Sequence, residues 1–208
     1  QRQMCIRDSI TIIGGGLAGS EAAYQIAKRG IKVKLYEMKP SKFSPAHSNC
    51  NLAEIVCSNS FKSNLITNAS GLLKEELRQL DSLLIKIADE VQVPAGQALA
   101  VDREKFAEEV TKRLEQFANI EVIRQEVGKE ISVKQLAENG IVIIATGPLT
   151  SESLSKEIQE LADQKVKIPM LGKTESLNAS VATAIIVYEY VRTCLLYTSP
   201  SPRDGLLS

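Results

Sequence analysis

A glycine pattern near the N-terminus constrains this chain more than any other feature. Gly14-x-Gly16-x-x-Gly19 follows a short apolar run, residues 10–13, and opens a helical pattern over residues 17–29. Residues 31–37 then alternate between apolar and polar side chains, which is typical of a strand. Strand, glycine turn, helix and strand in this order form one βαβ unit. The sequence therefore predicts an α/β fold that contains a Rossmann-like dinucleotide-binding domain.

The glycines and a following acid make FAD or NAD(P) the predicted class of ligand. The first glycine permits the tight turn, the second lets a pyrophosphate approach the backbone, and the third lets helix and strand pack closely. Glu37 ends the second strand, where a carboxylate accepts hydrogen bonds from ribose hydroxyls. The alternative is a glycine turn with an unrelated surface glutamate. The predicted cofactor-binding residues of this unit are Gly14, Gly15, Gly16, Leu17, Ala18, Gly19 and Glu37.

A second signal lies at residues 143–147. This apolar strand ends in Ala145, Thr146 and Gly147, and it resembles the late FAD-contacting strand of flavoproteins with two dinucleotide-binding motifs. Small residues there let the backbone approach a cofactor. We therefore predict that these three residues bind the cofactor. A buried strand followed by a glycine turn explains the pattern equally well.

The rest of residues 10–162 alternates between predicted strands and helices. We expect a loop over residues 38–68, and one long helix whose leucine stripe runs from Leu73 to Val91, with residues 74–78 as its solvated charged face. Further expectations are strands at 98–101, 120–123 and 141–145, a helix capped by Asp102, and a helix capped by Thr150 or Ser151. This order predicts a mainly parallel sheet with helices on both faces.

Cys57 is the candidate catalytic residue. As a nucleophile it needs a thiolate of lowered pKa, yet no histidine neighbours it and the nearest positive side chain in sequence is Lys62. The alternative is a small buried apolar residue. Cys50 and Cys57 do not have a zinc-site spacing, and His47 has no ligand partner at a useful interval, so we expect no metal site.

Charge and composition limit the possible partners. The 208 residues carry 25 basic and 25 acidic side chains, so a nucleic-acid site would have to be a local patch. Only 4% of residues are aromatic, and no basic stripe with interleaved aromatics is visible. No apolar run approaches the roughly 18 residues that cross a bilayer. The four cysteines form no CxxC pair, which favours a reducing, cytoplasmic setting.

Several longer motifs lie in this part of the chain, namely residues 14–23 (GGGLAGSEAA), 33–40 (VKLYEMKP), 45–47 (PAH), 54–60 (EIVCSNS), 94–103 (PAGQALAVDR) and 145–151 (ATGPLTS). Together they resemble one known family, the TrmFO family of folate- and FAD-dependent tRNA uracil-5-methyltransferases. The resemblance covers about residues 10–162. It implies that reduced FAD transfers a one-carbon unit from methylenetetrahydrofolate to C5 of a T-loop uracil in tRNA, and that NAD(P)H reduces the flavin.

The same resemblance gives Cys57 a role. Uracil C5 becomes a good nucleophile once a thiolate adds at C6. The family uses two reactive cysteines, and Cys57 matches one of them. Whether this residue attacks the base or takes part in flavin or proton transfer stays open, as does the oligomeric state.

The remaining segments do not resemble that family. Residues 1–9 and 193–208 are similar to translated adapter sequence or to disordered ends. Residues 166–192 resemble the last motif of SpoU-type RNA 2′-O-methyltransferases, which bind S-adenosylmethionine in a knot. We therefore predict an incomplete FAD-binding domain at 10–162 and a foreign segment at 163–192, joined near Ala162 to Lys165. The alternative function is a chimeric fragment of that S-adenosylmethionine-dependent enzyme, or an FAD-binding remnant without activity.

Overall fold

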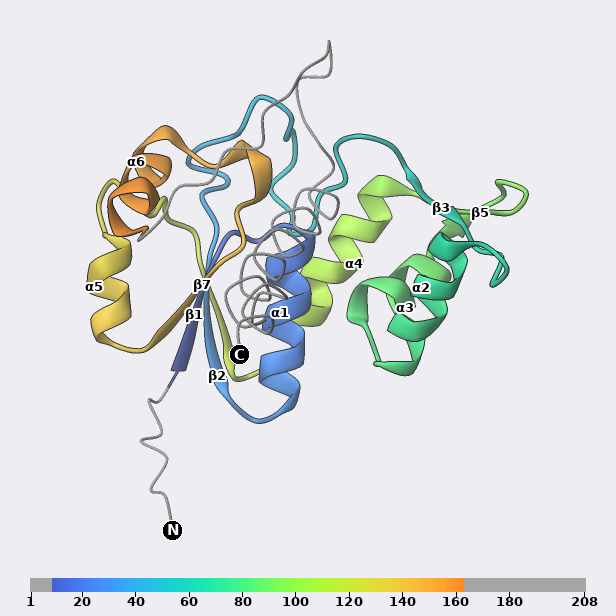
Figure 1. Ribbon diagram of the computed structural model, residues 1–208, viewed down its shortest axis with the longest axis horizontal. Helices are drawn as coiled ribbons and strands as arrows, with labels where there is room; N and C mark the ends of the chain where they lie inside the picture. Colours follow the sequence, from blue (N-terminus) through green and yellow to red (C-terminus); the bar gives the residue numbers. More distant parts are fainter. Residues whose placement is uncertain (1–8, 163–208) are drawn as a thin grey trace, which may run out of the picture. The chain divides into compact units, whose positions relative to one another are not determined.

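A parallel four-stranded sheet is the centre of the fold. The computed structural model describes residues 9–162. The sheet has the order β6-β2-β1-β7, and every neighbouring pair is parallel (Figure 1). Its strands are β1 (Ser9–Ile13), β2 (Lys32–Tyr36), β6 (Ile120–Ile123) and β7 (Ile141–Ile144). This arrangement confirms the predicted α/β class and the predicted parallel sheet, and it places Ser9 in the first strand.

Helices cover both faces of this sheet, as predicted. α1 (Leu17–Lys28) and α4 (Arg103–Glu115) lie on one face, and α5 (Val133–Glu138) and α6 (Glu152–Leu161) lie on the other (Figure 1). Successive strand residues point to opposite faces. Ile12 accordingly belongs to the core under α1 and α4, while Ile13 belongs to the core under α5 and α6. The short helix α5 was not predicted from the sequence.

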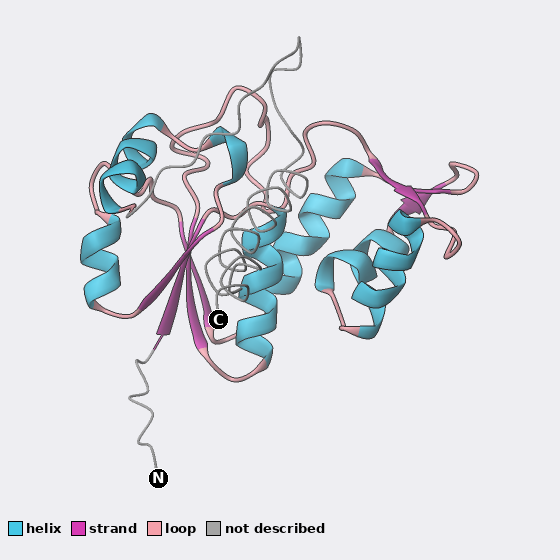
Figure 2. Ribbon diagram, viewed as in Figure 1, coloured by secondary structure: helices cyan, strands magenta, loops and turns pink. Residues whose placement is uncertain are grey.

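The structure also contains a second, smaller sheet of three strands. β3 (Ser60–Ser63), β5 (Ala98–Val101) and β4 (Gln92–Val93) form it in the order β3-β5-β4, with antiparallel pairing (Figure 2). The strand at 98–101 was expected, but its pairing was not. The expectation of an unbroken loop over 38–68 was wrong at β3, because pairing with β5 imposes an extended conformation on a short polar segment that shows no strand period.

The single long helix over residues 73–91 was also a wrong prediction. The structure has two helices, α2 (Ala69–Gln79) and α3 (Leu83–Glu90), separated by a turn in which Asp81 has a φ of 62°. Ser82 caps α3, because its side chain accepts a hydrogen bond from the Ile85 N–H. Leu73 and Leu80, two residues of the predicted leucine stripe, are 55% and 70% exposed.

The prediction that residues 74–78 form a solvated charged face was also wrong. Lys74 is only 4% exposed, and its Nζ donates to the carbonyls of Phe61 (2.9 Å) and Ser70 (2.7 Å). Arg78 donates from Nε and Nη2 to the two carboxylate oxygens of Asp89, at 2.7 and 2.8 Å. α2 therefore turns Lys74 and Arg78 toward the protein and leaves Leu72 and Leu73 exposed.

Two helix starts agree with the sequence. Asp102 accepts from the Lys105 N–H at the start of α4, and Ser151 accepts from the Leu154 N–H at the start of α6. A short 3-10 helix, η1 (Gly147–Leu149), connects β7 to α6. No helix among residues 9–162 combines the length and the apolar character required to cross a membrane.

Candidate functional site

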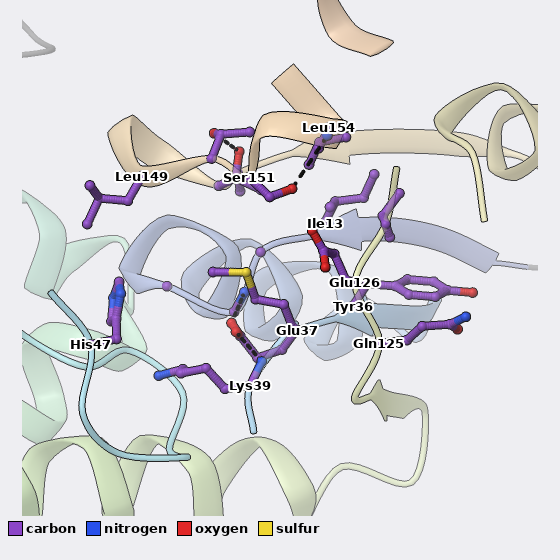
Figure 3. A pocket seen from close by; sticks show the side chains of 18 of the residues that line it. Ile13, Tyr36, Glu37, Lys39, His47, Gln125, Glu126, Leu149, Ser151 and Leu154 are labelled. Carbon is purple, nitrogen blue, oxygen red and sulfur yellow. Dashed lines mark hydrogen bonds between the residues drawn. The ribbon is translucent and has the colours of Figure 1, made fainter. Parts of the chain in front are cut away.

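A pocket opens at the carboxyl edge of the parallel sheet (Figure 3). The residues that follow all four strands contribute to it: Gly14 after β1, Glu37 after β2, Gln125 after β6 and Ala145 after β7. Ligands of open α/β sheets bind at this edge. The fold thus brings the two predicted signals, at residues 14–19 and 143–147, to one place.

The glycine turn is fixed by close backbone approach. A Cβ on Gly19 would lie 1.8 Å from the Gly14 carbonyl oxygen, so α1 can only begin this close to β1 with a glycine there. Gly14 has a φ of +103°, and its Cβ would lie 2.8 Å from the Ala145 carbonyl oxygen. Gly16, by contrast, has nothing within 4 Å of the Cβ position. The open space at the start of α1 is therefore on the Gly16 side, where helix N–H groups and the helix dipole attract a phosphate.

Glu37 is tied to the glycine turn. Its Oε2 accepts from the Gly15 N–H at 2.9 Å, its Oε1 accepts from the Lys39 N–H at 3.0 Å, and the residue is 7% exposed (Figure 3). A Cβ on Gly15 would lie 2.8 Å from Glu37 Oε2. The carboxylate therefore lines the pocket, and it also holds the turn in shape.

The wall after β7 is a compact polar turn. Ala145 and Thr146 line the pocket, and the Thr146 hydroxyl lies 2.6 Å from that of Thr150. Gly147 has a φ of +66° and opens η1. Among the predicted cofactor residues, those that do not line this pocket are Leu17, Ala18, Gly19 and Gly147. Gly19 and Gly147 instead serve the turns that shape it.

One wall was not predicted from the sequence. Gln125, Glu126 and Val127 follow β6 and line the pocket. A hydrogen bond from Lys42 lowers the pKa of Glu126 against the effect of its burial. Burial, with the nearby charge of Glu121, raises the pKa of Tyr36 at the end of β2. The predicted strand at 120–123 could have indicated this wall, because the residues that follow parallel strands gather at one edge of the sheet.

Residues 38–54 form the opposite wall. Lys39 Nζ donates to Glu54 Oε2 at 3.2 Å and to the Asn51 carbonyl at 2.6 Å, and both side chains of this ion pair are almost fully buried. Burial raises the pKa of Glu54, but hydrogen bonds from Ser48 and Lys39 outweigh it and leave the pKa lowered. Glu54 therefore holds the loop as a carboxylate.

Cys57 lies outside this pocket. Its side chain is exposed, and it lines a separate open depression with Asn59 and Arg103. The alternative of a small buried apolar residue does not describe it. Cys57 is three positions after Glu54, which lines the first pocket, so their Cα atoms lie within about 11 Å of each other. The thiol is thus accessible from solvent and close to the first pocket without belonging to it.

His47 lines the pocket as well. Within residues 9–162, no group of three or more histidine, cysteine, aspartate or glutamate side chains is arranged to hold a metal ion.

Comparison with known proteins gives one consistent family. A family model described as "Glucose inhibited division protein A" matches residues 9–187. A Lactobacillus johnsonii protein named methylenetetrahydrofolate--tRNA-(uracil-5-)-methyltransferase TrmFO is 58% identical over 179 residues, which cover 86% of this chain and 37% of the relative. An Acetivibrio thermocellus protein of the same name is 59% identical over 157 residues, covering 76% of this chain and 35% of the relative.

The chain spans a little over a third of the length of these curated relatives. Among solved structures, Aquifex aeolicus GidA matches with a TM-score of 0.45 and 19% sequence identity, over 57% of this chain and 19% of that chain. That likeness is too weak to add to the argument.

Proposed function

Since the chain belongs to the glucose inhibited division protein A family, we propose that it is the cofactor-binding N-terminal portion of a flavoenzyme that methylates C5 of a uracil in tRNA. The observation that carries the proposal is the pocket at the carboxyl edge of the sheet, with open space beside Gly16 and a buried acid, Glu37, across from it. The names of the relatives add the reaction.

The residues present fit FAD. The start of α1 offers unpaired backbone N–H groups to a diphosphate, and the missing Cβ of Gly16 leaves the space that a diphosphate needs. Glu37 lies at the end of β2, where a carboxylate accepts from ribose hydroxyls and disfavours a 2′-phosphate. Ala145 and Thr146 supply the wall after β7. Bound FAD, once reduced, supplies the one-carbon transfer chemistry.

Cys57 is the residue of this chain proposed to act on the base. Its exposed thiol, as a thiolate, adds to uracil C6, and the C5–C6 π electrons move toward O4 to give an enolate that is nucleophilic at C5. After C5 has bonded to the one-carbon unit, loss of the C5 proton and expulsion of the thiolate from C6 restore the C5–C6 double bond. The other role, in flavin or proton transfer, stays open, because the second reactive cysteine of the family lies outside this chain.

The co-substrates and the partner are proposed from the family. They are methylenetetrahydrofolate as one-carbon donor, NAD(P)H as reductant of the flavin, and tRNA as substrate, in the cytoplasm. The sequence shows no basic stripe with interleaved aromatics that would mark a tRNA site. The fragment by itself is proposed to be inactive, because it spans little more than a third of its relatives.

The comparisons do not favour the alternative, a fragment of an S-adenosylmethionine-dependent 2′-O-methyltransferase. The family match continues to residue 187, through most of the segment that resembled the second family. That segment lies outside the described residues, so its origin and the junction near residues 162–165 remain predictions. The ends, residues 1–8 and 193–208, lie outside them too.

Titration with FAD tests the proposal. The purified 208-residue chain is mixed with increasing FAD, and the quenching of flavin fluorescence gives the dissociation constant. We expect saturable binding with one FAD per chain. Absence of binding, in a chain whose circular dichroism shows a folded α/β protein, contradicts the proposed cofactor site.

A further inference from the structure

His47 is a pocket residue to which the proposed function gives no role. It comes from the loop between β2 and β3, and hydrogen bonds anchor this loop to the glycine turn, to α4 and to the segment after β6. The Ala53 N–H donates to the Gly15 carbonyl at 2.8 Å, and the Leu52 N–H donates to the Thr111 hydroxyl at 2.8 Å. Arg124 donates to the Cys50 carbonyl at 2.8 Å. The loop therefore presents its inner side chains to the pocket in a fixed arrangement.

The contacts of Ser44 determine which nitrogen of His47 carries the proton. Ser44 Oγ lies 2.5 Å from His47 Nδ1 and accepts from the Ala46 N–H at 3.3 Å. Ser44 is 7% exposed, so its hydroxyl proton needs an acceptor within the protein. Among the described residues, His47 Nδ1 is the acceptor that its geometry provides. Because Nδ1 accepts, the neutral ring carries its proton on Nε2.

The Nε2–H is a side-chain donor that the pocket does not use internally. Three pocket residues carry side-chain N–H donors, namely Lys39, His47 and Gln125. Lys39 Nζ is buried and uses two of its three N–H bonds on Glu54 and the Asn51 carbonyl, and Gln125 uses one of its two N–H bonds on Glu130 at 2.9 Å. No hydrogen bond from His47 Nε2 is present within residues 9–162, where the ring is bonded through Nδ1. Of these three side chains, His47 is therefore the one whose donor nitrogen has no partner among the described residues, so its N–H is available to an acceptor atom of a ligand.

The position of His47 indicates which part of a ligand it meets. In Figure 3 the ring lies at the same end of the pocket as Leu149, while Tyr36 and Gln125 lie at the other end. The remaining ionisable side chains of the pocket besides Lys39, Tyr36 and His47 are the carboxyl groups of Glu37, Glu54 and Glu126. Those groups suit hydroxyl or amine donors of a ligand, whereas a ring N–H suits an anionic acceptor.

We propose that the Nε2–H of His47 donates to a diphosphate oxygen of the bound dinucleotide, opposite the N–H groups at the start of α1, and that Ser44 sets the tautomer that makes this possible. The inference rests on the proposed FAD site. It adds to the backbone cradle a binding residue from a loop about 30 positions further along the chain.

The test uses FAD titration of the full chain and of three variants. A hydrogen bond to a charged group accounts for an affinity difference on the order of tenfold to hundredfold, so we expect His47→Ala to weaken FAD binding by that factor. His47→Gln places an amide N–H near the position of Nε2, and we expect its affinity to stay within about threefold of the parent chain. Cys50→Ala, an exposed position on the same loop, is the control and is expected to bind like the parent.

A second readout does not depend on affinity. The chain contains one histidine, so ¹⁵N nuclear magnetic resonance of the imidazole reports on His47 alone. We expect the Nε2–H tautomer before FAD is added and a change in the Nε2–H resonance afterwards. A Nδ1–H tautomer, or equal FAD affinity of the parent and His47→Ala, overturns the inference and leaves the FAD site standing. Failure of the parent chain to bind FAD overturns the proposed function instead.

Discussion

Replacing Gly16 with valine separates a cofactor effect from a folding effect. Gly16 is the N-cap of α1, with φ −73° and ψ −168°, a conformation that valine adopts without strain. Nothing in the protein lies within 4 Å of its Cβ position. The expected loss of stability is the poorer capping of valine, about 1 kcal/mol or less, which lowers Tm by roughly 2–4 °C in a domain of this size.

The same substitution removes the space for a diphosphate. The β-branched side chain would stand where the phosphates approach the N–H groups of α1, so we expect FAD affinity to fall at least about a hundredfold, or about 2.7 kcal/mol. Fluorescence titration, carried out well below Tm, measures this change. Gly16→Val with the affinity of the parent chain would refute the placement of the phosphates.

Gly19→Ala is the matched comparison within the same motif. A methyl group there would lie 1.8 Å from the Gly14 carbonyl oxygen, so α1 must move away from β1. The overpacking cost, about 3 kcal/mol or more against a backbone atom, exceeds the helix-propensity gain of about 1 kcal/mol. We expect a net loss of at least about 2 kcal/mol, seen as a fall in Tm of roughly 4–8 °C. The two variants thus differ in which property they lose.

Three further predictions concern other parts of the molecule. Glu37→Gln replaces a carboxylate oxygen by an NH₂ group that faces the N–H of Gly15 or Lys39, so we expect a loss of about 1–3 kcal/mol in urea unfolding, and an unchanged midpoint contradicts this. Burial, and after it the nearby positive charges, lower the pKa of Lys74. The unfolded chain therefore binds more protons between that lowered pKa and about 10.4, stability should rise with pH in this window, and a Lys74→Met variant should lack the rise. Cys57→Ala in a full-length relative of this chain should abolish tRNA methylation while FAD affinity stays the same, and normal turnover would exclude the thiol from the reaction.

The sequence predicted the elements whose signals are local. The βαβ unit, the strands at 120–123 and 141–144, and the caps at Asp102 and Ser151 all follow from residues within a few positions of each other. Hydrophobic period, glycine position and capping residue act over that range, so they could be recognised without a structure.

The break between α2 and α3 shows what could not be predicted. The carboxylate of Glu21, on α1, accepts from the Ser82 hydroxyl at 2.9 Å and from the Leu84 N–H at 3.1 Å. A residue about 60 positions away thus helps to cap α3, and the leucine spacing gave no sign of it. Asp81 takes its left-handed conformation in the turn before this cap. The burial of Lys74 follows from the same turn, because α2 is then free to rotate relative to α3.

Gly15 connects the glycine turn to the loop between β2 and β3. In the Gly-x-Gly-x-x-Gly pattern its position is one that any residue can occupy. Its N–H donates to Glu37 and its carbonyl accepts from Ala53. A Cβ there would lie 2.5 Å from Leu52 Cδ2. The first contact links the turn to β2, and the other two link it to the loop that carries His47. The glycine motif therefore does more than clear space for phosphates, because it also lets the loop after β2 close against the turn. A local pattern thereby positions a wall of the pocket that no local pattern encodes.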